Sequence, residues 1–568
     1  MRSQGIHSCL VEPKRLVCPL FVERFKLIFR RQPHSLYWLA YGVAVGFFVW
    51  TAAQFYLPGK GFTGLIYFGG NPELHRIREL QALDYYVDRD TKGYDGQYYA
   101  QIAVKPVLTS RDLRAAMDNL PYRARRILFC WTAYLLGLGQ PNLILQAYAL
   151  QNILCWLLLA WLLLRWFPPT NLSNLVRWAG TMFAWGLTMS VREALMDGPS
   201  LLLIAWGVAL AEQGRRWSSA CVLGVAGLGR ETNLLTALVH APAQKWNWRE
   251  VLGAAGRGLL VAAPLALWVA YLWSVFGEPS NAGGANLAAP FTAYFAKWFN
   301  TLVEFQSNGW DSSAKWTILL LVSMTVQFLV LLLRPQWANP WWRIGAPFVM
   351  LMIFLGEAVW AGFPGAAPRV VLPMTLAFNV LLPRGRWWWP VLILGNLSVL
   401  TAADQLTPPG RESFRLEGPL TIWRAPDSRA IDITFSQEWY QDERSNFEYW
   451  RWSRGSAGIV IHNPQAVAVE IEMDFDLRAF DARTIRVFQG QTLRWEGRVG
   501  RESAYVRLPH IRLDPGGNPW HFEADGPPSR PDGNTLRPVT FNLRNLVIRV
   551  VRKLDDQLAL VATQPRER

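Results

Sequence analysis

The stretch SLYWLAYGVAVGFFVWTAAQFYL, residues 35–57, contains no charged side chain and is long enough to cross a membrane as one helix. About 20 apolar residues are needed to span the roughly 30 Å hydrocarbon core. The run is too long for the core of a signal peptide, and seven Lys and Arg residues precede it in residues 1–35. We therefore expect an uncleaved first span with a basic, cytoplasmic N-terminus, residues 1–35.

The rest of the chain continues this pattern up to about residue 403. The sequence is 51% hydrophobic and 17% charged, whereas a soluble protein carries about 25% charged residues. The candidate spans are residues 36–56, 143–165, 177–191, 199–212, 217–229, 232–243, 258–276, 315–334, 343–360, 369–383 and 387–403. The sequence thus predicts a polytopic α-helical membrane domain of about eleven spans, residues 36–403, followed by a soluble domain, residues 411–568.

The apolar run ILFCWTAYLLGLG, residues 127–139, decides the orientation of everything after it. If this run does not cross, most Lys and Arg residues of the later connectors lie on the cytoplasmic side; if it crosses, the bias inverts. We therefore interpret it as a short helix at the outer face, with a twelfth span as the alternative. Residues 57–142 then form a long first outside loop, and the C-terminal domain is extracytoplasmic.

The net charge of +15 does not indicate a nucleic-acid-binding protein. No basic cluster has a nucleic-acid-binding pattern, and the basic residues fall largely between apolar runs, where they orient membrane spans. The five cysteines form no CxxC motif and no cluster with histidine, so no zinc site is expected. Membrane lipids are the expected surroundings of the helical domain.

The first outside loop contains the polar segment GYDGQYYAQIA, residues 93–103. Gly93 and Gly96 flank Asp95, which allows a tight turn, and helical spacing resumes after Gly96. Asp95 would stand near a helix start, where its ionised form is favoured, as a general base requires. The upstream motif DRD supplies Asp88 and Asp90 as second choices, and leaves open a divalent cation between these acids.

Further charged residues collect at the predicted outer face. Guanidinium groups bind phosphate oxygens in a bidentate manner, which makes these arginines candidates for an anion site. The alternative is that they anchor the protein at lipid headgroups. These residues are Arg123 and Arg126 in DNLPYRARRIL, Arg192, Glu193 and Asp197 in VREALMDGP, Arg230 and Glu231 in GLGRETN, and Arg369 in APRVVLP.

The order of these motifs resembles the bacterial GT-C-type glycosyltransferases, and more narrowly the branch associated with cell-surface glycopolymer formation. The resemblance covers roughly residues 36–385, and the tail is similar as well. It implies an enzyme of the bacterial plasma (inner) membrane that transfers a sugar from a polyprenyl-phosphate donor to a glycan or lipid acceptor on the outer face, with inversion. An acidic residue of the first outside loop serves as the base in this family.

By this resemblance Asp95 is the expected base. The expected donor phosphate-binding residues are Arg123, Arg126, Arg230 and Arg369, and the supporting polar residues are Tyr94, Gln97, Arg192, Glu193, Asp197 and Glu231. No cofactor is certain. A transporter or flippase for lipid-linked glycans, or a non-catalytic assembly subunit, remains the alternative.

Residues 411–568 read as a β-domain. The segment AVAVEIEMDFDL alternates apolar and polar residues, with Val469, Ile471, Met473 and Phe475 on one face. Similar signals at 457–461, 484–488, 503–508 and 541–551 predict a sandwich-like all-β domain. Its aromatic and acidic segments suit carbohydrate binding, and a structural lid is the alternative.

Overall fold

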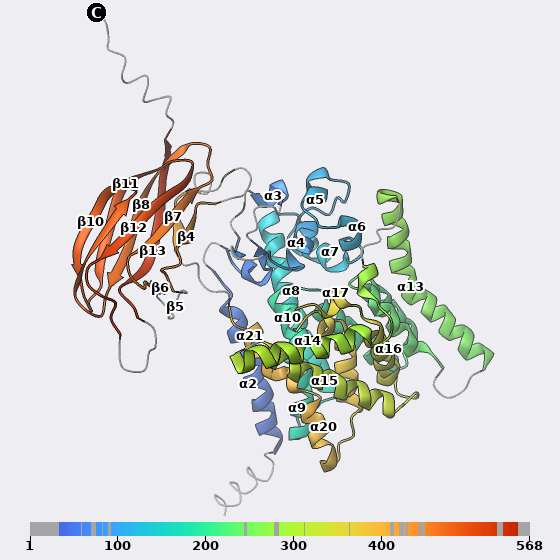
Figure 1. The fold of residues 1–568 in the computed structure, drawn as a ribbon. Helices are drawn as coiled ribbons and strands as arrows, with labels where there is room; N and C mark the ends of the chain where they lie inside the picture. The colour runs from blue at the N-terminus through green and yellow to red at the C-terminus, as the bar shows by residue number, and fades with distance from the viewer. Residues whose placement is uncertain are drawn as a thin grey trace, which may run out of the picture.

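The chain is described by a computed structural model that covers residues 33–554, apart from short gaps. The gaps are residues 58–59, 70–74, 82, 84, 89–91, 243–246, 278–282, 312, 363, 409–413, 420–424, 426–429, 441–442, 445–448 and 531–537. Most of the predicted cytoplasmic N-terminus, residues 1–32, lies outside the described residues. Figure 1 shows a helical region with a β-domain beside it.

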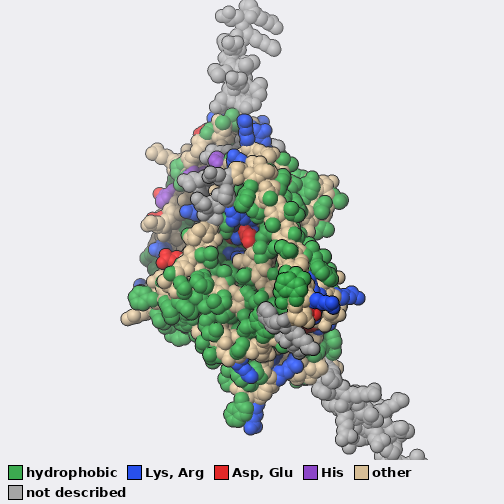
Figure 2. All heavy atoms as spheres, turned by 90° about the vertical axis from the view of Figure 1, so that its right-hand side faces the viewer, with side chains coloured by type: hydrophobic (Ala, Val, Ile, Leu, Met, Phe, Trp, Pro, Cys, Tyr) green, Lys and Arg blue, Asp and Glu red, His purple; other side chains and the backbone are tan. Residues whose placement is uncertain are grey.

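Four helices are long and apolar enough to cross a membrane. They are α2 (Pro33–Ala53), α8 (Pro141–Leu162) continued by η2 (Leu163–Arg165), α13 (Trp248–Phe276) and α15 (Ala314–Leu333). Many of their apolar side chains are exposed, among them Trp38, Leu259 and Leu267, as lipid-facing side chains would be. Figure 2 shows a broad hydrophobic surface over the helical region. These helices coincide with four of the predicted spans.

The other predicted spans fall on shorter or interrupted helices, so their crossing stays a prediction. The prediction of one helix over 177–191 is wrong, because the chain divides there into α9 (Leu172–Met182) and α10 (Trp185–Arg192). Phe183 leaves the helical conformation after α9, and Ala184, with ψ 137°, is the extended residue that precedes α10. Residues 387–403 divide in the same way, into η6 (Arg386–Trp388), α20 (Trp389–Leu394), η7 (Leu397–Thr401) and α21 (Ala402–Gln405).

The remaining elements of the helical region follow in chain order. They are α11 (Asp197–Glu212), α12 (Arg216–Gly227), η3 (Glu231–His240), η4 (Gly284–Asn286), α14 (Thr292–Asn308), η5 (Gly309–Asp311), α16 (Pro340–Phe354), α17 (Glu357–Trp360), α18 (Ala367–Val370) and α19 (Leu372–Leu381).

The residues between α2 and α8 fold into short elements that we call the cap. The cap comprises η1 (Thr63–Leu65), β1 (Phe68–Gly69), α3 (Arg78–Gln81), β2 (Val87–Asp88), α4 (Gly96–Val104), α5 (Arg111–Ala115), α6 (Leu120–Arg123) and α7 (Leu128–Leu136). Figure 1 shows α3 to α7 gathered at the top of the helical region. With 9 residues, α7 is about 14 Å long, half a hydrocarbon core, and its placement at the outer face without crossing stays a prediction.

The β-domain consists of two sheets, as the sandwich prediction requires. One sheet has the order β10-β9-β12-β7-β4 and the other β11-β8-β13-β6-β5, with β3 added on β13. Buried side chains from both sheets form one core, including Ile459, Phe475, Phe522 and Ile548. The strands are β3 (Arg415–Glu417), β4 (Asp432–Phe435), β5 (Glu443–Arg444), β6 (Tyr449–Trp452), β7 (Ala457–Asn463), β8 (Ala468–Arg478), β9 (Arg483–Gln489), β10 (Thr492–Val499), β11 (Ala504–Leu513), β12 (Gly516–Ala524) and β13 (Asn542–Leu554).

Candidate active site

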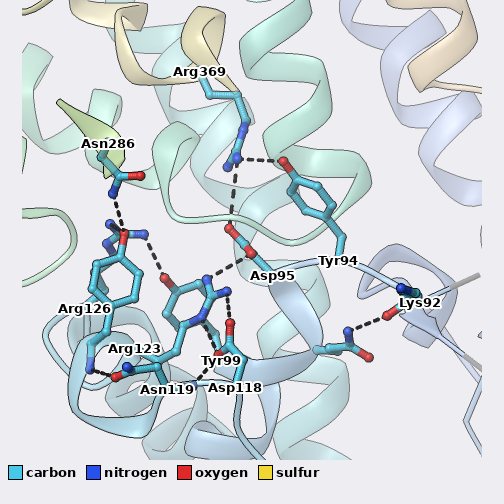
Figure 3. Close-up of polar contacts among 12 residues, drawn as sticks. Lys92, Tyr94, Asp95, Tyr99, Asp118, Asn119, Arg123, Arg126, Asn286 and Arg369 are labelled. Carbon is cyan, nitrogen blue, oxygen red and sulfur yellow. Dashed lines mark hydrogen bonds and ion pairs between the residues drawn. The ribbon is translucent and has the colours of Figure 1, made fainter. Parts of the chain in front are cut away.

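Asp95 stands immediately before α4, at the turn that the sequence predicted. Gly93 makes this turn with φ +68°, a conformation that residues with a Cβ rarely adopt. The Asp95 carboxylate does not cap the helix. It is free to face the cap interior, where it meets arginines from two distant parts of the chain (Figure 3).

Arg123, at the end of α6, joins Asp95 to a second acid. Its Nη1 lies 2.9 Å from Asp95 Oδ1, while its Nε and Nη2 donate to both oxygens of Asp118, at 3.1 and 2.7 Å. Its guanidinium also lies over the ring of Tyr98, with 4.9 Å to the centroid. Arg123 is therefore held rigidly, and it keeps one carboxylate oxygen of Asp95 fixed.

Arg369, on α18, approaches the other oxygen of Asp95. Its Nη2 lies 4.0 Å from Asp95 Oδ2 and donates to the Tyr94 hydroxyl at 2.9 Å. Its Nη1 donates to Asp197 Oδ2 at 3.0 Å, and Asp197 also forms an ion pair with Arg230. Asp197 is buried, with 3% of its side chain exposed, so it serves to position the two arginines.

Arg126 extends the cluster on the other side of Asp95. It donates to the hydroxyls of Tyr99 and Tyr122, at 2.9 and 3.0 Å, and its Nε pairs with Glu231 at 2.9 Å. Asn286, from η4, donates to the same Tyr122 hydroxyl at 3.2 Å. Residues from the cap, η3 and η4 thus meet at one place, and Figure 2 shows charged side chains of both signs in a hollow of this surface.

Asp95 is one of three partly exposed carboxylates of this arrangement, with Glu231 at 27% and Asp118 at 44% of the side chain exposed. It exposes 28% of its side chain, against 3% for Asp197. Burial opposes its ionisation, but Arg123, Arg369 and Arg126 together outweigh burial and hold the pKa of Asp95 below its usual range. Asp95 is therefore ionised at neutral pH and able to accept a proton.

Glu193 behaves in the opposite way. It follows α10, only 9% of it is exposed, and its Oε2 has no hydrogen-bond partner among the described residues. Burial raises its pKa to about 7, while Arg369 and Arg192 oppose the shift and Asp95 reinforces it. The site thus holds one carboxylate that is ionised at neutral pH and one that titrates near neutral pH.

Two of the predicted supporting residues, Gln97 and Arg192, bind backbone groups beside the cluster. The Gln97 side chain accepts from Gly69 N at 3.2 Å and donates to Lys92 O at 2.9 Å, so it fixes the turn that carries Asp95. Arg192 donates to Gly64 O at 3.2 Å and lies over the rings of Phe55 and Tyr67.

The DRD motif is not tested by the structure. Asp88 belongs to β2, but its side chain lies outside the described residues, and so does the whole of Asp90. Among the described side chains, no group of three or more His, Cys, Asp or Glu could hold a metal ion. The binding of a metal ion at the DRD segment therefore stays a prediction.

Sequence reasoning missed several partners of the cluster. Tyr99 and Asp118 lie within motifs already quoted, but no helical spacing pairs Asp118 with Arg123, because Asp118 precedes α6. Tyr122 lies beside Arg123 in the same motif. Asn286 comes from a distant segment with no motif, so only the fold reveals it.

No protein-family model matches the chain, and no curated protein sequence matches it either. A solved structure to which it is similar is that of the arabinosyltransferase EmbB from Mycobacterium smegmatis. That match covers 78% of this chain and 61% of the other, with 10% sequence identity and a TM-score of 0.23. The chain thus spans less than two thirds of that protein's length, and any function for it must rest on its own residues.

Proposed function

We propose that this chain is a GT-C-type membrane glycosyltransferase that moves a sugar from a polyprenyl-phosphate donor to a glycan or lipid acceptor, with Asp95 as the base. The observation that carries the proposal is the environment of Asp95. An accessible, ionised carboxylate lies between Arg123 and Arg369, and two more arginines lie in the same cluster. The order of the sequence motifs supports the same class of enzyme.

The residues divide into the two tasks of an inverting transfer. The acceptor hydroxyl oxygen attacks the anomeric carbon, and its proton passes to the Asp95 carboxylate. The bond between that carbon and the phosphate oxygen breaks, and its electron pair leaves with the polyprenyl phosphate. Arg126, Arg230 and Arg369 are the groups that would stabilise the departing phosphate, since positioned cations favour developing negative charge.

Asp197, Glu231 and Tyr94 are positioning residues in this proposal. Each one holds a guanidinium group through a direct contact: Asp197 holds Arg369 and Arg230, Glu231 holds Arg126, and Tyr94 holds Arg369. Fixed cations cost little reorganisation when charge develops at the leaving group.

The test compares two acids that pair with the same arginine. Asp95→Asn and Asp118→Asn both remove a carboxylate from Arg123, but Asp118 has 44% of its side chain exposed and does not contact Arg369. Purified variants are assayed with a panel of labelled polyprenyl-phosphate sugars. We expect Asp95→Asn to reduce transfer by at least about 100-fold, the usual scale of general-base catalysis, and Asp118→Asn to have a much smaller effect.

Full transfer by Asp95→Asn would overturn the assignment of the base. If the wild-type protein transfers none of the sugars but transports a lipid-linked glycan in vesicles, the transporter alternative replaces the enzyme. If it does neither but co-purifies with a transferase, the chain is an assembly subunit.

A further inference from the structure

A second group of polar side chains, three arginines and a histidine, lies where α12, η3, α13 and α16 meet, away from the candidate active site. It consists of Arg216, His240, Arg257 and Arg343, one from each element, and we call it the buried arginine cluster. The charges of Arg257, Arg343 and Arg216 all lie close enough to act on the His240 ring. Figure 1 shows α13 and α16 on the side of the helical region that faces away from the β-domain.

Three members of this cluster are more than nine-tenths buried. Residue exposures are 4% for His240, 6% for Arg257 and 7% for Arg343. His240 Nε2, Arg257 Nε and Arg343 Nε are buried atoms that have no hydrogen-bond partner among the described residues. An arginine that only orients a membrane span points toward headgroups and water, as the exposed Arg215 does. The buried members need a different explanation.

The cluster has too few acidic side chains to neutralise its arginines. Arg216 pairs with Glu250 at 2.9 Å, but in the described part of the chain no carboxylate lies within 4.0 Å of Arg257 or Arg343. Arg343 donates to the Ala241 carbonyl at 2.8 Å, and Arg257 lies over the Trp217 ring at 5.9 Å. The neighbouring residues 243–246, AQKW, contain no acid either. Uncompensated buried charge is costly, so this arrangement favours an anion supplied from elsewhere.

The buried arginine cluster lies far from the candidate active site. The far end of α13 reaches the cap, where Trp268 donates to Ala124 O at 2.8 Å and Arg114 lies over Phe276. Arg257 precedes Phe276 by 19 residues, which corresponds to about 28 Å along the helix. This distance is close to the thickness of a hydrocarbon core, so an anion here would lie near the opposite membrane surface.

We propose that the buried arginine cluster binds the phosphate headgroup of an anionic membrane lipid. A phosphate offers several acceptor oxygens to guanidinium and imidazole donors, which is the chemistry that the unpaired atoms require. The surroundings select a lipid over free phosphate. Trp217, over whose ring Arg257 lies, is exposed by 57%, and Leu252 and Leu259, on the same helix as Arg257, are exposed by 52% and 72%; these apolar side chains provide a surface for acyl chains.

The experiment measures the thermal midpoint of the full-length protein in nanodiscs of phosphatidylcholine, with and without phosphatidylglycerol. We expect phosphatidylglycerol to raise the midpoint of the wild type by several degrees, because a ligand that binds the folded state stabilises it. Arg257→Gln with Arg343→Gln should abolish this rise. Arg334→Gln is the matched control: it removes an exposed arginine just after α15, and should keep the rise.

Two results would overturn the lipid proposal. One is a rise that the double variant retains. The other is an equal rise on adding inorganic phosphate to phosphatidylcholine nanodiscs, which would assign the cluster to the free ion. A second measurement does not depend on the variants folding: photoactivatable phosphatidylglycerol should crosslink the wild type at the start of α13 or α16, and crosslinks confined to other helices would contradict the site.

Discussion

Two neighbouring acids of the candidate site differ in the charge they carry at neutral pH. Asp95 has three arginines near its carboxylate, which hold its pKa low, whereas burial raises the pKa of Glu193 to about 7. Titratable groups whose environments separate their pKa values are typical of acid and base pairs in enzymes. If Asp95 is the base, the protonation state of Glu193 determines the net charge around Arg369 during the transfer.

The pKa of Glu193 predicts a pH dependence of stability. Between pH about 4.5 and 7 the folded protein binds one proton more at Glu193 than the unfolded chain does. Raising the pH through this window therefore lowers the free energy of unfolding. We expect the thermal midpoint of the wild type in detergent to fall between pH 5 and pH 8, and Glu193→Gln to lose part of that fall.

Glu212→Gln is the control for this measurement. Glu212 pairs with Arg165 and accepts from the Trp166 indole, away from the cluster. Glu212→Gln should lower the thermal midpoint but keep its fall between pH 5 and pH 8. If the thermal midpoint of Glu193→Gln falls as much as that of the wild type, a group other than Glu193 causes the pH dependence.

At the scale of the element, α4 holds Asp95 in place by close packing of backbone against backbone. A Cβ built at Gly96 would lie 2.2 Å from Glu193 O and 2.8 Å from Ile66 O. Neither carbonyl is a flexible side chain that can move aside. The start of α4 is thereby fixed against the end of α10, and Asp95 against Glu193.

Gly96→Ala should therefore displace Asp95 from its arginines. A displacement of about 1 Å can cost on the order of 100-fold in rate, and we expect a loss of that size in the transfer assay. Gly258→Ala on α13 is the control, because a Cβ there meets nothing within 4 Å. Equal activity of the two variants would contradict the packing argument.

Elements also show how far the sequence could predict this molecule. Five strands of the β-domain, β7, β8, β9, β11 and β13, were predicted because alternation survives in a sheet with one buried face. Others, such as β10 and β12, were not predicted. The break between Met182 and Trp185 was not predicted, because hydropathy measures how apolar a run of residues is and does not report where the backbone turns. Asp95 and the arginines could be named singly from their motifs, but their pairing joins residues as far apart as Tyr94 and Arg369.

At the scale of the whole molecule, the β-domain has its own core. The side chains of that core come from residues 414 to 550, and none comes from the helical region. A unit with a core of this kind folds by itself in the usual case. The fragment 414–554 should therefore be soluble and unfold cooperatively, as measured by circular dichroism.

Phe522→Ala tests this within the fragment. Phe522 is fully buried, and removal of a buried Phe side chain costs about 3–5 kcal/mol. Tyr505→Ala, at a residue 62% exposed on the surface of β11, should cost much less. A fragment that unfolds without a cooperative transition would show that the helical region is needed for its stability.

The contact between Asp197 and Arg369 also has a consequence for synthesis, because 172 residues separate the two partners. At a ribosomal rate of about 5–20 residues per second, Arg369 emerges roughly ten to thirty seconds after Asp197. During that interval, of the two arginines that pair with Asp197 in the described part of the chain, Arg230 alone has been made. A polypeptide that ends before residue 369 can form the Asp197–Arg230 ion pair but not the Asp197–Arg369 one, so the contact that joins α11 to α18 is completed late in synthesis.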